Sequence, residues 1–97
     1  MVVEFLRFAV SPEDRATFLE ADAAIWTAAL SRYPGFIAKE TWIDQETGHV
    51  VTMIRWQDLN SWKSIPQSEL DALDAKMGKN WKPIVEARAL LPIGATT

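Results

Sequence analysis

Two carboxylates occupy positions where they could accept a proton from a buried ligand. Asp22 lies four residues before Trp26 and close to Phe18 and Ile25, at the edge of an apolar stripe. Glu4 lies within a short apolar run near the N-terminus. A carboxylate that is partly removed from water holds a proton more tightly than an exposed one, so either residue could deprotonate an acidic phenol. The alternative for Asp22 is a rim position, bonded to water or to a neighbouring side chain.

Charged side chains within extended segments offer a second kind of chemistry. Three are acidic and three are basic: Glu4, Arg7, Glu40, Arg55, Glu86 and Arg88. The equal numbers of the two signs favour ion pairs between neighbouring strands, which fix register more than they add stability. The functional alternative is that Arg55 or Arg88 binds an anionic substrate while Glu4 or Glu40 acts as the base.

Other reactive residue types are scarce. Histidine titrates near neutral pH, so His49 could be a general base, but its place beside a predicted turn is more typical of a solvated strand end. The chain has no Cys and only one His, so neither a thiolate nucleophile nor a transition-metal site is expected. Gly-rich phosphate loops, GxSxG and HExxH motifs do not occur. No cofactor is therefore expected.

The chain has five tryptophans, which could build a pocket for a flat ligand: Trp26, Trp42, Trp56, Trp62 and Trp81. The simplest interpretation is that they fill the volume between a sheet, its helices and a partner. Trp26 and Trp62 lie on two different helical segments, from which both could face the gap above a sheet. Together they could sandwich a small planar aromatic ligand.

Periodicity predicts the elements that would position these residues. Val-, Ile- and Phe-rich runs predict strands over residues 2–10, 36–43, 49–56 and 84–91. A long amphipathic helix is predicted from a cap at Ser11 to Pro34-Gly35. Its buried stripe would comprise Leu19, Ala23, Trp26, Leu30 and Tyr33, widened on one side by Phe18, Ile25 and Ala29. A short helix capped by Asp58 and a longer one capped by Ser68 and reaching Trp81 would follow.

The resulting order, β-α-β-β-α-β, predicts a ferredoxin-like α+β fold over residues 1–97 as one domain. Right-handed crossovers would give a four-stranded antiparallel sheet with both helices on one face. The third strand carries Val51 and Met53 on one face and Val50, Ile54 and Trp56 on the other, so both faces of the sheet are apolar. We therefore expect the uncovered face to pack against a second copy in a homodimer.

Composition excludes several partners. The net charge is −3, and the 10 basic residues form no stripe, so no nucleic acid is expected. No apolar run approaches the roughly 20 residues that span a bilayer, so no membrane association is expected. The N-terminal segment lacks a signal-peptide pattern, which favours a cytoplasmic location.

Short motifs in this order are similar to those of a known superfamily. Tyr33-Pro34-Gly35-Phe36 and Ile54-Arg55-Trp56-Gln57-Asp58 resemble motifs of the antibiotic-biosynthesis-monooxygenase branch of the dimeric α/β-barrel superfamily. Ile25-Trp26-Thr27 and Trp62-Lys63-Ser64-Ile65-Pro66 resemble a group of short uncharacterised cyanobacterial proteins within it. The resemblance implies a homodimeric α/β barrel with a pocket between sheet and helices in each subunit. Members include cofactor-free oxygenases of quinol-like aromatics and haem-degrading enzymes.

The resemblance also assigns positions. The Asn, Trp and His that haem-degrading members use correspond to Leu6, Ile65 and a position near Ala75, all apolar here, so that reaction is not expected. Quinol-oxidising members often carry a His in the second helix too. Leu6, Trp26, Trp62 and Ile65 are the expected pocket-lining residues.

Three hypotheses remain. The chain could be a cofactor-free oxygenase with Asp22 or Glu4 as base, a non-catalytic ligand-binding homodimer, or a structural module whose tryptophans fill its own pocket. A cavity above about 300 Å³ would favour either of the first two.

Overall fold

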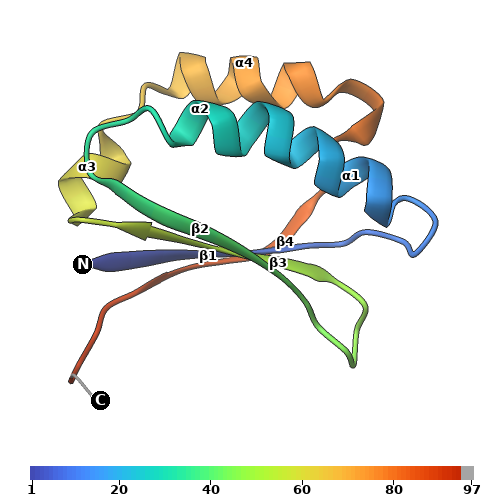
Figure 1. Ribbon diagram of the computed structural model, residues 1–97, viewed down its shortest axis with the longest axis horizontal. Helices are drawn as coiled ribbons and strands as arrows, with labels where there is room; N and C mark the ends of the chain where they lie inside the picture. Colours follow the sequence, from blue (N-terminus) through green and yellow to red (C-terminus); the bar gives the residue numbers. More distant parts are fainter. Residues whose placement is uncertain (95–97) are drawn as a thin grey trace.

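The protein forms one antiparallel sheet covered on one face by helices (Figure 1). The computed structural model describes residues 1–94. The strands are β1 (Val2–Phe8), β2 (Phe36–Ile43), β3 (Val50–Trp56) and β4 (Ile84–Leu90), and their order in the sheet is β2-β3-β1-β4. The predicted ferredoxin-like α+β fold is therefore confirmed.

Two groups of helical segments connect the strands. The first consists of α1 (Arg15–Asp22), a π-helical segment η1 (Ala23–Thr27) and α2 (Ala28–Leu30), which run on from one another. The second consists of α3 (Leu59–Lys63), α4 (Gln67–Met77) and a short 3-10 turn η2 (Gly78–Asn80). Figure 1 shows both groups of helices on the same side of the sheet, with α3 at one end of the strands.

Several predicted boundaries need correction. The first helix does not begin at a Ser11 cap: the Ser11 carbonyl accepts the Asp14 N–H in a turn, and the helix starts after Asp14. The second long helix follows Pro66 rather than a Ser68 cap, because the Pro66 carbonyl already accepts first-turn N–H groups. It ends at Met77, so Trp81 lies outside it.

The buried stripe of the first helix also differs from the prediction. Phe18 and Leu30 are buried as predicted, but Asp22 is buried as well and Ala23 is exposed. The π-helical segment holds about one residue more per turn than an α-helix would, so the residues before it and the residues after it are rotated relative to one another. A carboxylate thus takes a place that the periodicity gave to an alanine.

The helix-facing side of the sheet carries the core. Register places Val50, Thr52, Ile54 and Trp56 of β3 on this side, and each is at most 2% exposed. One apolar cluster gathers around Trp56 near α3, and a second around Phe18 gathers at the opposite end of the helices. A helix-facing cavity lies between the two clusters.

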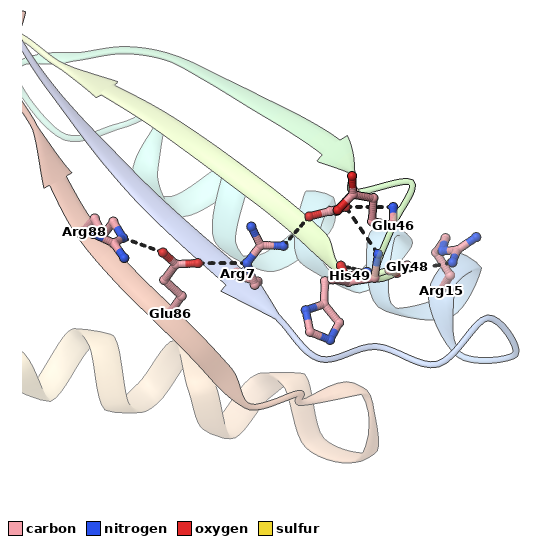
Figure 2. Close-up of polar contacts among 9 residues, drawn as sticks. Arg7, Arg15, Glu46, Gly48, His49, Glu86 and Arg88 are labelled. Atoms are coloured by element: carbon pink, nitrogen blue, oxygen red, sulfur yellow. Dashed lines mark hydrogen bonds and ion pairs between the residues drawn. The ribbon is translucent and has the colours of Figure 1, made fainter.

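The other side of the sheet combines apolar and charged side chains. Val3 and Val51 are buried at its centre even within a single chain. Figure 2 shows a row of ion pairs on β4 and β1 of this face, in which Glu86 pairs with both Arg88 and Arg7. Arg55 pairs with Glu40 at 2.8 Å. Opposite charges thus pair across this face as expected.

Glu4 does not join these ion pairs, which corrects its grouping with the other strand charges. It lies opposite Ile54 in the β1–β3 register and therefore faces the helices.

Candidate functional site

A cavity of about 470 Å³ lies between the sheet and the helices. Leu6, Thr52 and Ile54 contribute to its floor on the sheet, and Phe18 and Trp26 to its roof on the first group of helical segments. This volume is within the range of small-molecule pockets. The tryptophans therefore do not fill the space, and the site has room for a ligand.

A second, smaller cavity of about 290 Å³ adjoins the first. Glu4, Leu6 and Trp26 line both cavities, whereas Trp62 and Ile65 line only the smaller one. The site therefore has two lobes, and Glu4 lies where they meet.

Exposed residues mark the opening of the larger lobe. Asp74 of α4, Trp81 and Ile84 line the cavity but are exposed to solvent. Trp81 and Ile84 are each about half exposed, while Phe18 and Thr52 on the opposite walls are 1% exposed. Partial desolvation of its carboxyl group and the neighbouring charge of Asp71 raise the pKa of Asp74. A ligand can therefore enter between the end of α4 and the start of β4.

Glu4 is a carboxyl group held in a largely dry environment. Burial raises its pKa above the usual value, and three neighbours oppose this effect: the Trp56 indole, Lys63 and Lys39. The Trp56 Nε1–H donates to Glu4 Oε1 at 3.2 Å, and Trp56 itself is completely buried. The hydrogen bond fixes the carboxyl group while its second oxygen remains available to a ligand.

Asp22 is more buried than the rim position considered for it, and it is not a free carboxylate. Its Oδ2 lies 2.6 Å from Lys39 Nζ, and both side chains are at most 7% exposed. Lys39 Nζ also donates to Thr27 Oγ1 at 2.9 Å. The Asp22 charge is therefore already neutralised, which leaves Glu4 as the better placed proton acceptor.

Sequence reasoning missed Lys39. Register places Lys39 opposite Ile54, on the helix-facing side of β2. A lysine on the helix-facing side of a strand would have indicated a buried charge. The irregularity between Phe36 and Ala38 interrupts the alternation of the two faces along β2, so the sequence does not show which face Lys39 occupies.

His49 does not approach the cavity. It lies at the hairpin between β2 and β3, where its backbone N–H donates to Thr47 Oγ1 (Figure 2). Within residues 1–94, no three His, Cys, Asp or Glu side chains gather as a metal site. No helix in that range is both long and apolar enough to cross a membrane.

Comparison with known proteins agrees with this fold. The family model described as antibiotic biosynthesis monooxygenase matches residues 1–70. No curated protein shows a significant sequence match.

Solved structures share the fold at low identity. SnoaB, a cofactor-independent oxygenase from Streptomyces nogalater, is 20% identical with a TM-score of 0.72, over 97% of this chain and 94% of that one. The monooxygenase ActVA-Orf6 from Streptomyces coelicolor, solved with nanaomycin D, is 20% identical with a TM-score of 0.71, over 99% and 90%. Rv0793 from Mycobacterium tuberculosis is 17% identical with a TM-score of 0.71, over 99% and 98%.

Proposed function

Because the chain belongs to the antibiotic biosynthesis monooxygenase family, we propose that it is a cofactor-free oxygenase of quinol-like planar aromatics. The observation that carries this proposal is the partly buried Glu4 carboxyl group, with its raised pKa, in the wall of a mainly apolar cavity of about 470 Å³. A raised pKa makes a carboxylate a better match for an acidic phenol. Leu6, Trp26, Trp62 and Ile65 are the proposed walls, and Asp22 is the weaker candidate base.

The proposed reaction needs only the substrate and dioxygen. Glu4 removes a proton from the aromatic, and the negative charge spreads onto a ring carbon. One electron passes to dioxygen, and the substrate radical and superoxide then join through a new carbon–oxygen bond. The peroxide takes the proton back from Glu4. Loss of water breaks the O–O bond and removes the last hydrogen of that carbon. Substrate and dioxygen thus give a quinone and water.

The protein contributes position and a dry environment to this reaction. Apolar walls keep water from the anion, so charge-stabilising contacts act at a low dielectric. The Trp56 hydrogen bond holds Glu4 in one orientation, which reduces the motion needed for proton transfer.

Oxygen uptake with an anthrone such as dithranol tests the proposal. We expect wild-type protein to consume oxygen above the uncatalysed rate, and Glu4→Gln to reduce this excess by about 10²–10⁴-fold. Glu20→Gln, on the exposed side of α1, is the matched control and should leave the rate unchanged. Equal rates for wild type and Glu4→Gln would exclude Glu4 as the base.

The second candidate function is ligand binding without catalysis. It is favoured by the cavity lining, which contains no His or Asn among residues 1–94. Quenching of tryptophan fluorescence by quinones, without any oxygen uptake with quinols, would support this function over the first.

We also propose that the protein is a homodimer formed through the uncovered face of the sheet. Phe5, Met53 and the half-exposed Trp42 lie on this face beside the buried Val3 and Val51. An apolar surface of this kind is typical of an interface. Size-exclusion chromatography with light scattering at micromolar concentration measures the mass, and a monomer would contradict the proposal.

A further inference from the structure

Lys39 is the buried cation of the cavity, and its ammonium group is only partly used. An ammonium group has three N–H donors. Two of them reach Asp22 Oδ2 at 2.6 Å and Thr27 Oγ1 at 2.9 Å. Residues 1–94 provide no recorded acceptor for the third, and Lys39 lines the larger lobe. The third donor is therefore available to a ligand.

The π-helical segment holds this ammonium group from one side. Asp22 and Thr27 are five residues apart, so in a regular α-helix they would point about 140° away from each other. The Ala28 N–H donates to the Ala23 carbonyl, which is the five-residue spacing of a π-helix. This wider turn brings Asp22 and Thr27 to the same side, where both accept from Lys39. Such segments occur frequently at functional sites.

The sheet places Lys39 across the cavity from Glu4. Glu4 lies opposite Ile54 in one register, and Ile54 lies opposite Lys39 in the next. The three residues therefore form a row, with backbones of Glu4 and Lys39 roughly 10 Å apart at two strand spacings. A planar ligand above Ile54 would have the carboxyl group on one side and the ammonium group on the other.

Thr52 adds a second donor to the same wall. Thr52 is 1% exposed and lines the larger lobe. Its Oγ1 has no hydrogen-bond partner within residues 1–94. A buried hydroxyl group without a partner is unfavourable, so a ligand oxygen that bonds to it would bind more tightly.

We propose that Lys39, assisted by Thr52, binds the ligand oxygen on which negative charge develops when Glu4 removes the proton. This inference rests on the proposed function and names its substrate class: a fused-ring aromatic with a carbonyl or phenolate oxygen on the side away from the acidic proton. Donors fixed in advance at such an oxygen stabilise the anion because they need no reorganisation. Asp22 and Thr27 act as positioning residues that hold Lys39.

Other charges also face the cavity. They come from several of the elements around it: Glu4 on β1, Asp22 on α1, Asp74 on α4, Lys82 before β4 and, in the smaller lobe, Lys63 on α3. Lys82 is paired with Asp14 at 2.7 Å, as Lys39 is with Asp22. Lys82 therefore provides a matched control, because it lines the same cavity near its opening.

The ionisation of a bound dye tests the inference without requiring turnover. Alizarin, a hydroxyanthraquinone, changes colour when its phenol loses a proton. We expect its apparent pKa in the cavity to rise by about one unit in Lys39→Met relative to wild type, the size expected for removal of one nearby charge. Asp22→Asn, which removes the opposing charge, should lower it. Lys82→Met should change it much less, because Lys82 lies near the solvent-exposed opening of the cavity and is paired with Asp14.

Several outcomes would overturn the inference. They are no binding of alizarin to wild type, the same ionisation in wild type and Lys39→Met, or an equal shift in Lys82→Met. Asp22→Asn/Lys39→Met removes both charges and should give a dye pKa above that of wild type but below that of Lys39→Met, so it serves if either single variant fails to fold.

Oxygen uptake with dithranol on the same variants separates the two proposals. If no variant consumes oxygen but the dye shift depends on Lys39, the oxygenase is wrong and the oxyanion subsite stands. If oxygen uptake depends on Glu4 while Lys39→Met keeps both full uptake and the wild-type dye pKa, the oxygenase proposal stands and the oxyanion subsite is wrong.

Discussion

The Asp22–Lys39 ion pair should dominate the local energetics of the cavity wall, and a double-mutant cycle measures it. Both side chains are at most 7% exposed, so removing one partner leaves a buried charge without its opposite. Such a loss costs about 3–5 kcal/mol. The adjoining cavity can admit water, which favours the lower end. We expect Asp22→Asn and Lys39→Met each to lower the free energy of unfolding by about 3 kcal/mol.

The double variant should be less damaging than the sum of the two. Replacing both charges removes the uncompensated ion, so Asp22→Asn/Lys39→Met should cost about 2 kcal/mol or less. The two single costs add to about 6 kcal/mol, which gives a coupling energy of about 4 kcal/mol. With a slope of about 1.5 kcal/mol per molar urea, each single variant should shift the unfolding midpoint by about 2 M. Tryptophan fluorescence follows the transition, because Trp56 is completely buried.

A second ion pair of nearly the same length provides the control. Lys82 Nζ lies 2.7 Å from Asp14 Oδ2, but the Asp14 side chain is 50% exposed. Asp14→Asn and Lys82→Met should therefore couple by only about 0–1 kcal/mol. If the costs of Asp22→Asn and Lys39→Met add within about 0.5 kcal/mol, the buried pair is not coupled and the reasoning fails.

Three further predictions concern stability. Because the pKa of Glu4 is raised on folding, its ionised form opposes folding above that raised pKa. Glu4→Gln should therefore raise Tm at pH 7, by an amount that declines towards pH 4; a constant gain in thermal melts would contradict this. Deleting Ala24, an exposed residue of η1, should return the helix to regular α-helical geometry and keep the fold. Deleting Glu20 from α1 should instead rotate the buried face that precedes it by about 100° and lower Tm strongly. Circular dichroism melts compare the two, and equal losses would refute the role of the extra residue. Gly35→Ala should cost at least about 2 kcal/mol in urea unfolding, because Gly35 has a φ of 88° and an added Cβ would lie 2.2 Å from a hydroxyl group on α3. Gly48 also has a positive φ but no close contact, so Gly48→Ala should cost only about 1–2 kcal/mol. A larger loss for Gly48→Ala than for Gly35→Ala would contradict the role of the close contact at Gly35.

The strands and their order could be predicted from the sequence because apolar runs and turn residues are local signals. The limits of β2 agree with the prediction, and Asp58 caps α3 as expected, since its side chain accepts the Ser61 N–H. Gly48 has the positive φ expected at the hairpin turn.

The arrangement of the site was less accessible to sequence reasoning. Glu4 and Asp22 were considered as candidate bases, but the Lys39 partner of Asp22 comes from a strand 17 residues later. Nothing in the local sequence of Ala23–Thr27 distinguishes a π-helical from an α-helical turn. Only the three-dimensional contact, in which Thr27 and Asp22 accept from one ammonium group, reveals the difference.

The widened turn in the first helix also affects how this chain should be aligned with its relatives. A protein whose helix lacks the additional residue corresponds to this one only if a one-position gap is placed within Ala23–Thr27. Without that gap, every equivalence on one side of the gap is displaced by one position, and a pocket residue is matched to a solvent-facing one. At 17–20% identity, pairwise scores barely penalise such a displacement. Superposed backbones, rather than aligned letters, are the sound basis for equating residues of this helix between family members.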